Sequence, residues 1–304
     1  LQDQGATKLI LDLRDNPGGF LHIAKQIADE FLTNNKLIVF TKNKKGRVEK
    51  YFATKKGDFE NGEVYVLINE NSASASEIIA GALQDNDKGT ILGRRSYGKG
   101  LVQREMALGD GSAVRLTVSR YYTPTGRSIQ RSYENGNDDY YHEYYKRVDN
   151  GELSEASSIA VADSLKFTTP NGKVVYGGGG IIPDVFVPID KKMENRTIDR
   201  IVDSGIMSYF VFEDLDKDRT PYQNISQEDF VKNHIISNEQ LERFTDYLNK
   251  RTRYKITFVA YKEEVKLYIK ATLAEQLYGS EAHMQVLNTN DAMLEKVKEL
   301  AVNN

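Results

Sequence analysis

A short serine-rich turn contains the densest group of residues that could do chemistry. Residues 72–77 (SASASE) follow the apolar run 64–68 and precede IIAGAL, so Ser74 is expected where a strand turns into a helix. Free backbone N–H groups and the positive end of a helix dipole stabilise an oxyanion at such a turn, as nucleophilic attack by a serine requires. Ser74 and Glu77 also have the spacing of a capping box. These residues alone favour a hydroxyl that only caps the helix, which does not exclude catalysis.

A lysine between two glycines is the candidate base. Lys99 lies in the segment GRRSYGKGLVQ, and Gln103 follows four residues later. A lysine acts as a general base when burial and a nearby helix N-terminus lower its pKa toward neutrality. If residues 101–106 are extended, the even offset places both side chains on one face, where Gln103 could orient the lysine. The alternative is an ordinary surface lysine in a glycine turn.

The same segment nearly matches a phosphate-binding loop. Residues 93–99 have the pattern G-x4-G-K, but Gly100 stands where magnesium binding needs Ser or Thr. The following LVQREM is typical of a strand, whereas a phosphate-binding loop must open a helix. A P-loop nucleotide-binding protein is therefore the weakest alternative.

A second turn, DNPGG, closes the apolar run 9–13. Gly18 and Gly19 indicate a tight turn that needs a positive φ. At the carboxyl end of a parallel strand, such a turn can also present a free N–H group to a site.

Composition excludes several classes of protein. The 304 residues include 41 Lys and Arg against 44 Asp and Glu, and this near balance argues against a protein built to bind nucleic acid. No apolar run approaches the ~20 residues of a membrane helix. The absence of cysteine excludes a disulfide scaffold, a zinc finger and a thiol nucleophile. The four histidines are scattered, so metal catalysis has little support, and no cofactor is expected.

Strand-like and helical segments alternate over the first two thirds of the chain, which predicts an α/β or mixed α+β core with largely parallel pairing. Strands are expected at 9–13, 37–41, 47–52, 64–68, 90–92, 101–106, 113–122 and 174–176, and helices at 20–32 and 76–84. The aromatic and acidic segment 133–145 is interpreted as an inserted loop.

From about residue 191 the pattern becomes helical. Amphipathic helices are expected at 198–212, 227–234, 239–250, 259–277 and 281–302. We therefore expect a core at 1–190 and a separate helical domain at 191–304. The first residues show no signal-peptide pattern and run at once into a strand, so we expect a piece cut from a longer protein.

Five ordered segments between residues 9 and 184 resemble the carboxyl-terminal processing, or tail-specific, proteases of the S41 serine peptidase family. They are LILDLRDNPGG, VYVLINENSASASEIIAGALQD, GRRSYGKGLVQ, RLTVSRYYTPTGRSIQ and GGIIPD. The resemblance implies that Ser74 is the nucleophile, Lys99 the general base and Gln103 the residue that holds the lysine. It implies an oxyanion hole formed by the N–H groups of Gly19 and Ala75, with Gly18 less favoured.

The resemblance also implies a serine endopeptidase that cleaves flexible protein tails, without cofactor or metal. It implies export to a periplasm or cell envelope and a PDZ domain upstream of this chain. The adjacent Arg94 and Arg95 depart from the family pattern, in which many relatives carry an acidic residue, and could alter the charge around Lys99. The helical domain could form homo-oligomers or bind an adaptor. A relative that binds peptide tails without cleaving them is the main alternative.

Overall fold

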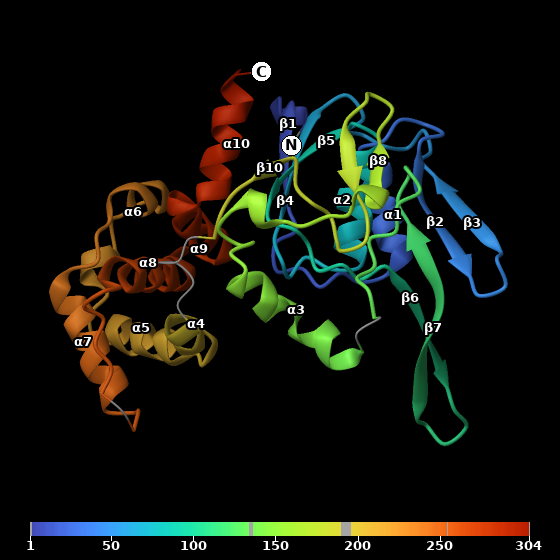
Figure 1. Ribbon diagram of the computed structural model, residues 1–304. Helices are drawn as coiled ribbons and strands as arrows, with labels where there is room; N and C mark the ends of the chain where they lie inside the picture. The colour runs from blue at the N-terminus through green and yellow to red at the C-terminus, as the bar shows by residue number, and fades with distance from the viewer. Residues whose placement is uncertain (1, 134–135, 190–195, 254, 304) are drawn as a thin grey trace. The chain divides into compact units, whose positions relative to one another are not determined.

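The computed structural model describes residues 2–133, 136–189, 196–253 and 255–303 (Figure 1). The chain divides into two compact units. Unit 1 comprises Leu1–Pro188 and Lys296–Asn304, and unit 2 comprises Ile189–Glu295. Among the described residues, no helix combines the length and the apolar character needed to cross a membrane.

A parallel sheet, sheet A, lies in unit 1 and has the strand order β1-β4-β5-β10. Its strands are β1 (Lys8–Asp12), β4 (Glu63–Ile68), β5 (Gly89–Gly93) and β10 (Val185–Phe186). Two helices follow β1 and β4 in the chain, α1 (Leu21–Asp29) and α2 (Ala75–Asp85). Every residue of α2 is buried. Burial on all sides explains why residues 78–83 (IIAGAL), in the middle of α2, are all apolar or small rather than amphipathic.

A second sheet in unit 1, sheet B, is antiparallel and has the order β3-β2-β7-β6. Its strands are β2 (Leu37–Asn43), β3 (Val48–Phe52), β6 (Leu101–Ala107) and β7 (Ala113–Tyr122). The expectation of largely parallel pairing is wrong for this sheet. Short turns join β2 to β3 and β6 to β7, and only antiparallel strands can be joined in this way. Figure 1 shows the β6–β7 hairpin extending beyond the rest of sheet B. A small antiparallel pair, β8 (Lys166–Thr168) and β9 (Val174–Tyr176), completes the strands.

The segment interpreted as an inserted loop contains a helix, α3 (Asn137–Asp149), so that interpretation is wrong. Gly136 precedes it with a φ of 89°, a conformation that glycine adopts without strain. Glu143 pairs with Arg147 one turn later and with Arg131 before the helix. These ion pairs stabilise a helix that its apolar periodicity did not reveal.

Unit 2 is helical, as its sequence predicted. It contains α4 (Arg196–Asp203), α5 (Ile206–Lys217), α6 (Gln227–Asn233), α7 (Asn238–Asn249), α8 (Lys262–Tyr278) and α9 (Ser280–Leu287), and α10 spans Ala292–Asn303. The single helices expected at 198–212 and 281–302 are each two helices. The first is interrupted at Gly205, whose φ of 73° breaks the helix. Short 3-10 turns lie at Gln2–Gln4, Ala156–Ser158, Asp163–Leu165, Thr220–Tyr222 and Asn288–Asn290.

Candidate active site

Ser74 lies at a strained turn between β4 and α2. Its φ of 56° and ψ of −111° fall in a region that residues with a side chain rarely adopt. Such a conformation costs about 1–3 kcal/mol and persists only when neighbouring contacts enforce it. The Ser74 N–H donates to Glu77 Oε2 at 2.9 Å, and the Tyr121 hydroxyl donates to the Ser74 carbonyl at 3.1 Å. The Glu77 part of the expected capping box is therefore formed, and it holds a half-buried serine at the start of α2.

Glu77 has a second role that its sequence position did not reveal. Its fully buried carboxylate accepts hydrogen bonds from four donors: Ser74 N (2.9 Å), Ser96 Oγ (2.5 Å), Gly98 N (2.6 Å) and Lys99 N (2.8 Å). Burial raises the pKa of the Glu77 carboxyl, and these hydrogen bonds act in the opposite direction. One oxygen, Oε2, accepts from both Ser74 and Lys99. The backbone of the candidate nucleophile and that of the candidate base are thus fixed to the same atom.

Lys99 and Gln103 line one cavity of about 560 Å³ in unit 1. The residues around it are Asp15, Pro17, Asn71, Ala73, Tyr97, Lys99, Leu101, Gln103, Tyr133, Tyr140 and Tyr141. Ser74 directly follows Ala73 of this lining. The expected extended segment is β6, which begins after Lys99 and has a register irregularity between Val102 and Gln103. Within the described residues, neither the Lys99 ammonium nor the Gln103 amide makes a hydrogen bond to a protein group.

The DNPGG turn packs directly against Ser74. Gly18 has a φ of 95°, and a Cβ placed on it would lie 2.9 Å from Ser74 Cβ and 2.6 Å from Ala75 N. No other residue fits there. The Gly18 N–H is already donated to Asn16 Oδ1 at 2.9 Å. By contrast, among the described residues no group accepts a hydrogen bond from the N–H of Gly19 or of Ala75. Of the glycines in the turn, Gly19 therefore keeps a donor that can bind an oxyanion.

Buried ion pairs hold the segment that leads to Lys99. Arg94 pairs with Glu70 at 2.7 Å, and Arg95 pairs with Glu152 at 2.6 Å. The Arg147 guanidinium of α3 donates to the carbonyl of Ser96 at 2.9 Å. The two arginines that depart from the family pattern are thus each neutralised by a buried carboxylate.

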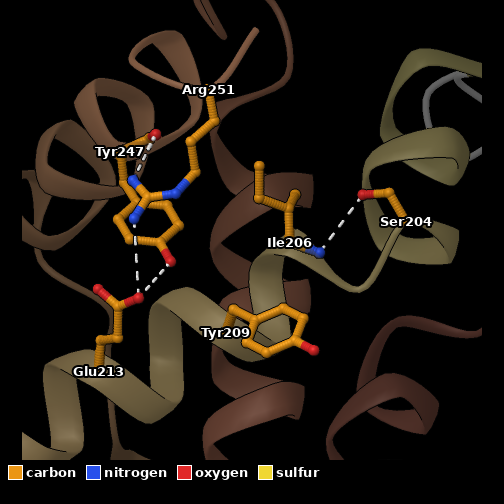
Figure 2. Close-up of a pocket in the computed structure, with 6 residues that line it drawn as sticks. All are labelled: Ser204, Ile206, Tyr209, Glu213, Tyr247 and Arg251. Atoms are coloured by element: carbon orange, nitrogen blue, oxygen red, sulfur yellow. Dashed lines mark hydrogen bonds and ion pairs between the residues drawn. The ribbon is translucent and has the colours of Figure 1, made fainter.

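A cavity within unit 2 also has several polar groups but contains none of the candidate catalytic residues (Figure 2). It measures about 430 Å³ and is lined by Ser204, Ile206, Tyr209, Glu213, Tyr247 and Arg251. Glu213 accepts a hydrogen bond from the Tyr247 hydroxyl at 2.7 Å and lies 3.7 Å from Arg251. Arg251 also packs over the Tyr247 ring. Three polar residues of this lining, Glu213, Tyr247 and Arg251, therefore interact with one another. Within the described part of the chain, no group of three or more metal-ligating side chains occurs.

Two family models match separate parts of the chain. Residues 1–136 match peptidase family S41, and residues 197–279 match a family of unknown function, DUF8443. A carboxy-terminal-processing protease of Bartonella bacilliformis is 50% identical over 122 residues, which cover 40% of this chain and 28% of that protein. A carboxyl-terminal-processing protease of Synechocystis sp. is 44% identical over 131 residues, covering 43% of this chain and 30% of the relative.

Among solved structures, a photosystem II D1 C-terminal processing protease matches 62% of this chain and 36% of its own length, with 29% identity and a TM-score of 0.42. The chain spans about 30% of the length of the two curated relatives. The segment 1–136 belongs to peptidase family S41. Within this family, the matching relatives are carboxyl-terminal-processing proteases, the group that the sequence motifs indicated.

Proposed function

We propose that this protein is a serine endopeptidase that cleaves flexible C-terminal regions of proteins, with Ser74 as nucleophile and Lys99 as general base. The observation that carries the proposal is the Glu77 carboxylate, which holds the backbones of both residues through one oxygen. The strained turn at Ser74 is a second support, because backbone strain is concentrated at functional sites.

In the proposed reaction, neutral Lys99 accepts the hydroxyl proton as Ser74 Oγ attacks the scissile carbonyl. The N–H groups of Gly19 and Ala75 stabilise the oxyanion of the tetrahedral intermediate. When the C–N bond breaks, Lys99 gives its proton to the leaving amine, and an ester with Ser74 remains. Water then attacks the ester, Lys99 accepts a proton from the water, and that proton returns to Ser74 Oγ. Gln103 orients the lysine from the same cavity.

The wider context is part of the proposal. We infer an exported protein of the periplasm or cell envelope, with a PDZ domain upstream that captures substrate tails. Residues 1–190 form the catalytic core, and the helical domain 191–304 assembles copies of the chain or binds an adaptor. The names of the curated relatives support the substrate class.

The test uses a fluorophosphonate probe, which reacts covalently with an activated serine and needs no substrate capture. We expect the wild-type chain to be labelled at Ser74 and to cleave the unfolded protein β-casein. Lys99→Ala should lower both rates at least about 10,000-fold, as loss of a catalytic base does in other serine peptidases. As a control, Ser112→Ala, which replaces an exposed serine in the β6–β7 turn, should leave both the labelling rate and the cleavage rate unchanged.

Full labelling of Lys99→Ala would contradict the proposed base. A wild-type chain that binds β-casein but neither cleaves it nor reacts with the probe would instead identify a non-catalytic, tail-binding relative. A crystal structure with bound peptide gives the distance between Ser74 Oγ and Lys99 Nζ, which must be about 3 Å for direct proton transfer.

A further inference from the structure

Four tyrosines share the cavity with Lys99. Tyr97 precedes the lysine by two residues, Tyr133 lies just before α3, and Tyr140 and Tyr141 lie on α3 itself. The S41 match ends at residue 136 and the second match begins at residue 197. Helix α3 therefore belongs to neither matched segment, although it lines the same cavity as the candidate base.

The tyrosine rings form a continuous aromatic wall. Tyr133 stacks on Tyr140 with ring centroids 4.2 Å apart and an interplanar angle of 12°. Tyr97 and Tyr141 both meet Tyr140 edge to face, at 6.3 Å and 5.5 Å. The Arg131 guanidinium lies 4.0 Å from the Tyr97 ring centroid and 4.1 Å from that of Tyr140. Tyr140 is buried at the centre of the wall, whereas Tyr141 is 70% exposed and Tyr133 is 42% exposed.

The wall is tied to the loop that carries the base. Glu143 of α3 pairs with Arg131 at 2.6 Å, and this pair holds the arginine that lies against the rings. Arg147, 2% exposed, donates to the carbonyl of Ser96, three residues before Lys99. Since these contacts fix Tyr140 at the centre of the wall and the lysine loop, this part of the cavity is preorganised.

We propose that α3 and its tyrosines form a substrate subsite that takes a large apolar or aromatic side chain next to the scissile bond. This inference rests on the proposed function and names its substrate preference. Aromatic pairs gain energy beyond the area they bury, which favours rings, and the burial of apolar area favours branched aliphatic side chains over alanine. A cationic side chain gains little from this lining to offset the loss of its water. Asp15 is the one carboxylate of the lining, and its Oδ1 already accepts from Asn69 and Asn71.

The test uses internally quenched peptides of one alanine-rich sequence that differ only at the residue beside the scissile bond: Ala, Leu, Phe or Lys. The intact wild-type chain should cleave the Phe and Leu peptides with at least about tenfold higher kcat/KM than the Ala and Lys peptides. Tyr141→Ala should reduce the Phe-to-Ala ratio about tenfold, and Tyr141→Phe should restore it. Tyr145→Ala, a matched change on the same helix outside the cavity lining, should leave the ratio within twofold.

The experiments distinguish a failure of the proposed subsite from a failure of the proposed function. Unchanged ratios in Tyr141→Ala and Tyr133→Ala, with cleavage retained, would overturn the subsite and leave the proposed function standing. Binding of the Phe peptide to Ser74→Ala, measured by fluorescence anisotropy, gives a readout that needs no turnover. If the wild-type chain cleaves no peptide but this binding weakens about tenfold when Tyr141→Ala is added, the subsite stands and the proposed function fails. Equal binding of the Ala and Phe peptides would overturn the subsite.

Discussion

Unit 1 contains ion pairs whose two side chains are both buried, in addition to exposed ones. In unit 1, Arg127 and Asp85 pair at 2.7 Å with both side chains fully buried. In unit 2, Arg243 and Asp214 pair at 2.8 Å, but the arginine side chain is 41% exposed. Buried ion pairs are costly to desolvate, so they are weak contributors to stability and are kept where geometry must be unique. The difference is what we expect if unit 1 holds the proposed site, since both units have a hydrophobic core of their own.

Backbone conformation separates the units in the same way. Among the described residues, the non-glycine residues with positive φ are Asp15, Asn35, Ser74 and Asp87, and all lie in unit 1. Unit 2 instead begins two of its helices with unstrained serine caps, Ser226 and Ser237. Sequences follow local rules except where function requires otherwise. Two of the residues with positive φ, Asp15 and Ser74, lie beside the cavity that contains Lys99.

The largest effect that would sharpen this comparison is expected for Arg127→Met. The guanidinium donates to Asp85, to Gln84 and to the Tyr176 carbonyl, so its loss leaves a buried carboxylate without its cation. We expect the free energy of unfolding of unit 1 to fall by about 3–5 kcal/mol. Hydrogen exchange measured by mass spectrometry on peptides from each unit gives the two values separately.

The matched control is Arg243→Met in unit 2, where an exposed pair is worth less than about 1 kcal/mol. Equal losses in the two units would contradict the contrast between a buried and an exposed arrangement of charge.

The next effect tests whether Glu77 holds both halves of the site. Glu77→Gln replaces one acceptor oxygen by an amide group that faces N–H donors, so we expect a loss of about 1–3 kcal/mol in unit 1 and slower labelling of Ser74 by the fluorophosphonate.

The pH dependence of Glu77→Gln has a definite sign. Burial raises the pKa of Glu77 in the folded chain, so protonation of Glu77 stabilises the folded state. This stabilisation is fully present below the ordinary pKa of 4.5. It is lost as the pH rises through the raised pKa. The stability difference between wild type and variant should therefore be smaller at pH 8 than at pH 5, and a difference that grows with pH would contradict the raised pKa.

The smallest effect concerns His234, a half-buried histidine of unit 2. His234 stacks on Phe230 with ring centroids 4.4 Å apart, and burial and the charge of Lys270 lower its pKa below the ordinary 6.5. Its neutral form contributes stability above pH 6.5 that is lost as the pH falls through the lowered pKa. We expect hydrogen exchange in unit 2 to accelerate below pH 6.5 relative to His234→Phe, after correction for intrinsic exchange rates. A difference in peptides from unit 1 would show that the effect is not local.

The sequence predicted those parts of the molecule whose structure depends on residues close to one another along the chain. The buried run at 64–68 and the small apolar residues after Ser76 were sufficient to predict β4 and α2. Helix α3 was missed because its support comes from ion pairs with Arg131 and other residues outside its own periodicity. The break at Gly205 was missed because apolar residues continue on both sides of it.

The site shows the same limit. Ser74, Lys99 and Gly19 were each found as candidates, but only the resemblance to a family joined them, since spacing along the chain does not reveal proximity. The hydrogen bonds of Glu77 to Gly98 and Lys99 span 21 and 22 residues, and no local pattern encodes them. The S-x-x-E spacing identified Glu77 as a partner of the Ser74 backbone, but it gave no sign that Glu77 also binds the backbone of Lys99.

The contact between Arg147 and Ser96 also sets the order in which the site can be completed during synthesis. The two residues are 51 positions apart, and the ribosome makes the arginine last. A growing chain therefore carries its serine and its lysine well before the helix that anchors the lysine loop has emerged. For the peptidase proposed above, we expect this delay to leave the proposed reactive centre incomplete while the chain's own unfolded segments are the nearest polypeptide.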